Sequence, residues 1–147
     1  MKTKVSLTRA SPPALSLKSI SELGTGTTAS MSISYDNKTF RSASNTANGE
    51  VGAETTFHYH QDGTVVWAEY SGGSVVRGSL IAKIRPEDGD SLDMRYHHVN
   101  RDGRIMTGQC VSHPEVLADG RLRMHEVWQW TSGDGSSGES IIEEVRA

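Results

Sequence analysis

Glu126 is the residue of this sequence whose surroundings point most clearly to chemistry. It lies in an alternating row that a β-strand would turn to one face, together with Met124, Trp128 and Trp130. An ionised carboxylate on an apolar sheet face costs free energy unless a charge or hydrogen bonds compensate it. Three interpretations stay open: Glu126 anchors a ligand in a pocket, acts as a general acid or base with a raised pKa, or makes an internal bond. The candidate partners for such a bond are Arg41, Tyr70 and His98.

Aromatic residues would form a wall around this carboxylate. Pockets commonly combine such walls with a few convergent polar groups, although a closed barrel also needs bulky side chains simply to fill it. The polar tips of Tyr and Trp need partners when they are buried, which favours a cavity holding water or a ligand. The candidate ligand-binding residues are therefore Arg41, Tyr59, Tyr70, Tyr96, His98, Cys110, Glu126, Trp128 and Trp130.

Cys110 and His113 together suggest nucleophilic catalysis, but nothing in the sequence supplies an oxyanion hole or a third partner. A cysteine on an inner row is more often a small buried hydrophobic residue. We therefore assign no catalytic residue and favour a binding protein for a small organic molecule. The alternative is a small enzyme that uses Glu126 as general acid or base.

Histidine pairs raise the question of a metal site. His58 and His60 are two residues apart on one strand and point the same way, but no glutamate follows within a few residues, because the next is Glu69. If the odd positions of this strand face inward, both histidines face solvent. His97 and His98 are adjacent and point to opposite faces. The sequence therefore predicts no metal and no cofactor.

Short β-strands are the elements that must position these residues. From Met31 onward, turn signals such as Asn48-Gly49 and Gly72-Gly73 recur at short spacing, and they tolerate the positive φ that hairpins need. The runs between them have β-forming composition. Their alternation predicts which positions face inward. The expected inner residues, strand by strand, are Thr55, Phe57 and Tyr59; Val66, Ala68 and Tyr70; Val76, Gly78, Leu80, Ala82 and Ile84; Leu92, Met94, Tyr96 and His98; Met106, Gly108, Cys110 and Ser112; and Leu122, Met124, Glu126, Trp128 and Trp130.

This pattern predicts an all-β protein with a single up-and-down antiparallel barrel of about eight strands. A barrel of that size can hold one small ligand, as in lipocalins and streptavidin. The same turn spacing also permits a β-sandwich. We place the barrel domain at residues 31–147.

The composition limits which classes of binding partner and which cellular compartment we expect for this protein. The net charge of −3 argues against nucleic acid, and no apolar stretch is long enough for a transmembrane helix, so no membrane association is expected. The single cysteine cannot form an internal disulfide, which fits a reducing compartment and predicts a soluble cytoplasmic protein. The oligomeric state stays open.

Residues 1–30 differ in kind from the rest, because they are rich in Ser and Thr and nearly free of acidic residues. They suggest a disordered tail or a start codon placed too early. A transit peptide, which would make the protein organellar, has a similar composition. A structured part of the domain is a further interpretation.

Several motifs resemble a known family. They are the run from Lys38 to Val51, Tyr70-Ser71-Gly72-Gly73, Met94-Arg95-Tyr96-His97, and His125 to Gly133. Over about Met31 to Val145 the chain resembles small uncharacterised proteins that are often labelled N-acetylglutamate synthase. The resemblance implies a calycin- or streptavidin-like barrel and carries over no catalytic residues. The residues themselves show no Gly-rich turn before a helix, which an acetyl-coenzyme A transferase of the usual type needs.

Overall fold

The computed structural model describes residues 33–146, so the predictions for residues 1–30 lie outside the described part, and the domain boundary at Met31 stays a prediction. Eight strands follow one another in this part of the chain. They are β1 (Thr39–Asn45), β2 (Thr56–Asp62), β3 (Val65–Gly72), β4 (Val75–Ile84), β5 (Leu92–Asn100), β6 (Ile105–Val116), β7 (Leu122–Trp130) and β8 (Ser137–Val145).

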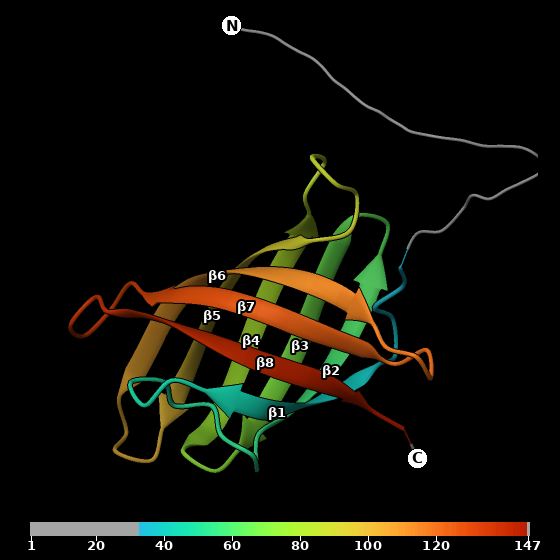
Figure 1. Ribbon diagram of the computed structural model, residues 1–147. Helices are drawn as coiled ribbons and strands as arrows, with labels where there is room; N and C mark the ends of the chain where they lie inside the picture. Colours follow the sequence, from blue (N-terminus) through green and yellow to red (C-terminus); the bar gives the residue numbers. More distant parts are fainter. Residues whose placement is uncertain (1–32, 147) are drawn as a thin grey trace, which may run out of the picture. The chain divides into compact units, whose positions relative to one another are not determined.

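The strands form one closed barrel in sequence order (Figure 1). Each strand pairs antiparallel with the next, and β8 returns to pair with β1, which leaves no free sheet edge. The predicted all-β, up-and-down barrel of eight strands is confirmed. The sandwich alternative is wrong, because the ring of strands closes on itself instead of splitting into two sheets. The described residues include no helix long and apolar enough to cross a membrane.

Alternation along the strands places the predicted rows on the inside with one exception. Val76 was expected to face inward, but it is 53% exposed, while its neighbour Val75 is 1% exposed. The pairing of β4 with β5 shifts register between Val75 and Arg77. Such a bulge adds one residue to the strand and exchanges inner and outer positions beyond it. From Gly78 onward the expected inner row is restored.

The two ends of the barrel are built differently. At the end that holds the β2–β3, β4–β5 and β6–β7 connections, large side chains fill the interior, including Phe40, Leu92 and Met124. Tyr35 lies ahead of β1 and donates a hydrogen bond to the Asp90 carbonyl in the β4–β5 connection, which joins the chain's first described segment to this end. Each such buried apolar side chain contributes about 1.5–3 kcal/mol.

Residues 46–55, which we call the β1–β2 loop, lie at the other end, as the antiparallel order requires. The backbone of this loop passes closely over the end of β3. A Cβ atom on Gly72 would collide with the carbonyl group of Glu54, and Gly72 also has a φ of 118°. Glycine is therefore required at Gly72, and the loop is held against the barrel there.

Candidate functional site

A cavity lies inside the barrel beneath the β1–β2 loop. It has a volume of about 50 Å³. A single water needs roughly 10–15 Å³ on this scale, so the cavity has room for a few waters. Pockets for drug-sized molecules span roughly 300–1,000 Å³, so most of this interior is occupied by side chains.

Eight of the nine predicted site residues line this cavity. They are Tyr59, Tyr70, Tyr96, His98, Cys110, Glu126, Trp128 and Trp130. Arg41 is the ninth, and its predicted place in the interior is wrong. It is exposed because it occupies an odd position of β1, where the even positions Phe40 and Ser42 face inward.

The aromatic wall rests on tilted and edge-to-face contacts between rings. The centroids of Trp128 and Trp130 are 5.5 Å apart at an interplanar angle of 60°, and those of Tyr96 and Trp130 are 5.8 Å apart at 67°. These geometries suit aromatic pairs, which avoid a face-to-face sandwich. The rings of Tyr96, Trp128 and Trp130 are therefore inclined to one another and do not lie in parallel stacks.

Glu126 lies at the centre of a three-strand row of polar residues. It is the direct cross-strand partner of Ser112 on β6 and of Ser140 on β8. The hydroxyl of Ser112 donates to Oε2 over 2.9 Å, and that of Ser140 donates to Oε1 over 3.2 Å. None of the partners expected from the sequence takes this place. The carboxyl group is held by its two neighbours in the sheet.

The interior disfavours the charge of Glu126. Desolvation raises the pKa of this carboxyl from 4.5 to about 7, and the two serine hydrogen bonds offset only part of that effect. Burial likewise raises the pKa of the Tyr59, Tyr70 and Tyr96 phenols and of the Cys110 thiol. Glu126 is therefore surrounded by groups that stay neutral near pH 7.

Tyr59 carries the one buried side-chain polar atom of residues 33–146 that has no hydrogen-bond partner, its phenolic oxygen. Tyr59 is 1% exposed and lines the cavity. The charge of Glu126 further raises its pKa, so the two groups interact electrostatically. An unsatisfied buried hydroxyl costs about 1–3 kcal/mol, which makes it a place where a water or a ligand is gained favourably.

His98 joins the cavity wall to the β1–β2 loop. Its Nε2 lies 2.8 Å from Oε1 of Glu50, and its Nδ1 lies 3.0 Å from the Tyr70 hydroxyl. An ionised carboxylate only accepts, so Nε2 donates to Glu50, and Nδ1 shares the second hydrogen bond with the Tyr70 hydroxyl. Asn100 also donates to Glu50 over 3.2 Å. The His98 side chain is fully buried, whereas that of Glu50 is 26% exposed.

The indole groups also bond to the chain around the loop. Trp130 Nε1 donates to the carbonyl of Asn48 over 3.0 Å, and Trp128 Nε1 donates to Oδ1 of Asn45 over 3.2 Å. The β1–β2 loop is therefore held over the barrel mouth by side chains from β5 and β7. Sequence reasoning missed Glu50, and no local pattern marks it, because its partners are distant in the sequence.

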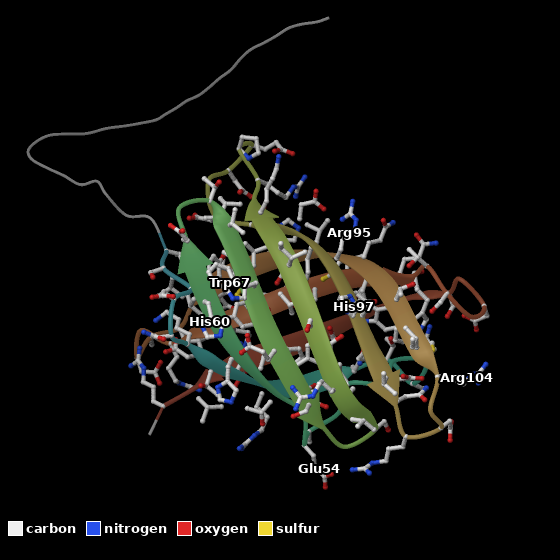
Figure 2. All side chains as sticks on the ribbon, turned by 180° about the vertical axis from the view of Figure 1, so that it is seen from behind. Glu54, His60, Trp67, Arg95, His97 and Arg104 are labelled. Carbon is white, nitrogen blue, oxygen red and sulfur yellow. The ribbon has the colours of Figure 1, made fainter. Side chains whose placement is uncertain are left out.

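The cysteine and histidines that the sequence analysis considered for catalysis or metal binding do not lie together in one site. Cys110 faces inward and His113 is exposed on the outer side of β6, since residues three apart on a strand face opposite ways. His60 lies on the outer surface beside Trp67, where its ring stacks at 5.6 Å and bonds to Glu69 over 2.9 Å (Figure 2). Across residues 33–146, no three His, Cys, Asp or Glu side chains gather as a metal site would require.

Comparison with known proteins identifies a family. A family model described as "Avidin-like protein" matches residues 33–145. No curated protein matches the chain, and no solved structure does. The matched range contains all eight strands and every residue that lines the cavity.

Proposed function

The chain belongs to the avidin-like protein family, and from this premise we propose that its barrel binds one small organic molecule beneath the β1–β2 loop. The observation that carries the proposal is the position of Glu126, which faces an aromatic-walled cavity and whose hydrogen bonds within residues 33–146 come from two serine hydroxyls. A ligand would contact Tyr96 and Trp130 with an apolar body and direct a polar group to Glu126. Apolar walls with few polar groups are typical of small-molecule sites.

Binding of an organic molecule requires the interior to open. The free volume of about 50 Å³ is too small for such a molecule. The β1–β2 loop is the part of the wall that can move while the strand pairing stays intact, because it lies between β1 and β2 and side-chain hydrogen bonds to Glu50 and Asn48 join its middle to β5 and β7. Ligand entry would therefore displace this loop, as lids do in other binding proteins.

A small enzyme with Glu126 as general acid or base is the second candidate. The pKa of about 7 favours it, because catalytic acids and bases work best near the operating pH. The neighbouring Tyr59 and Cys110 have raised pKa values and stay neutral, so they offer no ionised partner at the inner end of the cavity. Binding without chemistry therefore has the stronger support.

The test is a thermal-shift screen of the full chain against a broad panel of metabolites that includes glutamate and acetyl-coenzyme A. A ligand present at 100 times its Kd adds about 2.7 kcal/mol to the stability, which shifts Tm by several degrees. The Glu126→Gln variant should lose the shift, and the matched surface variant Glu139→Gln should keep it. A panel without any specific shift would contradict the proposal. Turnover of a bound molecule that stops in Glu126→Gln would favour the enzyme.

A further inference from the structure

The β1–β2 loop contains the one Asn-Gly pair of the sequence, Asn48-Gly49. Asparagine is a thermolabile residue, and its side-chain amide is attacked most easily where the next residue is glycine, which has no Cβ atom to hinder the approach. Asn48 is exposed and Gly49 is half-buried. The loop over the cavity therefore carries the two groups of a spontaneous backbone reaction.

Packing against Asn45 requires glycine at Gly49. A Cβ atom at Gly49 would collide with the side-chain amide of Asn45. That amide donates to the carbonyl of Val51 over 3.0 Å, and its oxygen accepts from Nε1 of Trp128 over 3.2 Å. The Asn45 side chain is thus held from two sides and does not give way to a larger residue. The fold therefore keeps an unhindered backbone nitrogen directly after Asn48.

The side chain of Asn48 fastens the loop to the start of β8. Its Nδ2 donates to Oγ of Ser136 over 3.0 Å and to the carbonyl of Ser137 over 2.9 Å. A carbonyl only accepts, so the bond to Ser137 requires an N–H donor. An ionised carboxylate in the place of the amide has no hydrogen to donate and would face the carbonyl oxygen directly. Loss of the amide therefore removes this attachment of the loop.

The reaction of the pair is internal and needs only water. The backbone nitrogen of Gly49 forms a bond to Cγ of Asn48, the bond between Cγ and Nδ2 breaks, and ammonia leaves with the proton of the Gly49 amide. The product is a cyclic imide, a succinimide. Water then opens the ring at either of its carbonyls. One opening gives aspartate, and the other gives isoaspartate, in which the backbone runs through Cγ and is one carbon longer.

The closed loop holds both reacting groups in other hydrogen bonds. The N–H of Gly49 donates to the carbonyl of Thr46 over 2.9 Å, while the Asn48 amide donates to Ser136 and Ser137. Attack requires the release of both groups, because the Gly49 nitrogen must lose its proton and the Asn48 side chain must turn toward it. The rate is then proportional to the fraction of molecules in which the loop is open, as for other processes that require local opening.

We propose that Asn48-Gly49 is a self-modification site that converts the β1–β2 loop irreversibly from a closed to an open form. Open loops react, and the product cannot restore the bond to Ser137. Isoaspartate also displaces Gly49 from its position against Asn45, because the backbone has lengthened. The carbonyl of Asn48 accepts from Trp130, so the change reaches the cavity wall. The switch depends on contacts of the loop and requires no ligand.

Incubation of the full chain at mildly alkaline pH tests the reaction and its gating, because base removes the backbone proton. Mass spectrometry of peptides follows the conversion of amide to acid over days. We expect conversion at Asn48 and much slower conversion at Asn37, Asn45 and Asn100, which no glycine follows. Conversion at Asn48 should be at least about tenfold slower in the folded chain than in urea, because opening breaks several hydrogen bonds. Equal rates would overturn the proposal, and so would a folded chain without any conversion.

Glu50→Ala changes the opening of the loop without altering the reacting pair, because it removes the acceptor for His98. The conversion rate at Asn48 and the hydrogen-exchange rate of residues 46–55 should change by the same factor in the folded variant, and conversion in urea should not change. Different factors would overturn the proposal. Asn48→Gln is the matched control, since its longer side chain keeps an amide but closes an imide ring far more slowly. It should show no conversion.

The effect of the modification on the loop is measured on the modified chain itself, which ion exchange separates because it carries an additional negative charge. Hydrogen exchange of residues 46–55 should be several-fold faster than in the unmodified chain, and exchange in the barrel strands should not change. Asn48→Asp should reproduce this increase without incubation, since it also lacks the donor to Ser137. A modified chain whose loop exchanges as slowly as the unmodified one would overturn the switch.

Discussion

The ring of Tyr96 lies directly against Gly108, its cross-strand partner on β6. A Cβ atom at Gly108 would collide with the phenol ring, so the ring occupies the space that a side chain would take. The same relationship recurs at two other places in the cavity wall. These are the cross-strand pairs Tyr70–Gly78 and Trp128–Gly138. Inner glycines on neighbouring strands thus allow large rings to lie close to the sheet.

Gly108→Ala should therefore destabilise the barrel by about 1–3 kcal/mol, because Tyr96 must leave its position against β6 and overpack its neighbours. The free energy of unfolding in urea measures the effect. Gly52→Ala is the matched control, since a Cβ there meets nothing within 4 Å. It should stay within about 0.5 kcal/mol of the wild type. Equal effects at the two sites would show that Tyr96 is free to move.

Glu126 should make the stability depend on pH. Its folded pKa of about 7 exceeds the ordinary 4.5, so between these values the folded state binds more protons than the unfolded state. Stability from this group therefore falls as pH rises through that window, by about 3 kcal/mol in total, and is constant above it. Urea unfolding of the wild type and Glu126→Gln across this range measures the difference.

The expected result for Glu126→Gln is a gain relative to the wild type that grows from about pH 4.5 to about pH 7. The altered hydrogen bonds to Ser112 and Ser140 add an offset that does not change with pH. Glu139→Gln on the exposed side of β8 should show no such trend. A constant difference between wild type and Glu126→Gln would mean that the cavity end is hydrated enough to accept the charge.

Glu50 should control opening of the β1–β2 loop. Glu50→Ala removes the acceptor for His98 and Asn100, so hydrogen exchange of residues 46–55 should become faster. Hydrogen-exchange mass spectrometry reports this region separately from the strands. Glu54→Ala in the same loop is the control, because Glu54 is exposed at the barrel end (Figure 2). Unchanged exchange in Glu50→Ala would show that Asn48 and the tryptophans suffice to hold the loop.

Cys110 should be unreactive in the folded protein. Burial raises the pKa of its thiol well above 9.0, and the charge of Glu126 adds to the effect. Only the thiolate is a good nucleophile, so iodoacetamide at about pH 8 should modify unfolded but not folded chains. Intact-mass measurement follows the reaction, since the sequence has one cysteine. Rapid modification under native conditions would reveal frequent opening of the interior.

The fold and the inward-facing side chains could be predicted because both depend on local pattern. Residues two apart on a strand share a face, so alternation placed Glu126, Trp128 and Trp130 on one row and Tyr59 and Tyr70 on others. Turn residues between the runs then predicted a meander that closes. The prediction that Val76 faces inward was wrong because a β-bulge changes the alternation there. A bulge depends on the pairing with the neighbouring strand, which the residues of one strand do not reveal.

The partners of Glu126 could not be read from the sequence, because they depend on the register between strands. Only that register places Ser112 and Ser140 beside Glu126, although each is 14 residues away. The same holds for Glu50, which reaches His98 across 48 residues.

The sequence by itself thus determined a set of about eight strands whose inner face is aromatic and contains a carboxylate, because alternation is a property of each strand. It favoured a barrel over a sandwich, and the pairing of β8 with β1 decided between them. The tertiary structure alone decided how that interior is satisfied. It placed Arg41 on the outer face of the barrel and left the Tyr59 hydroxyl without a hydrogen-bond partner among residues 33–146. It also closed the mouth of the barrel with the β1–β2 loop. These features arise from contacts between distant strands, and no local pattern of residues encodes them.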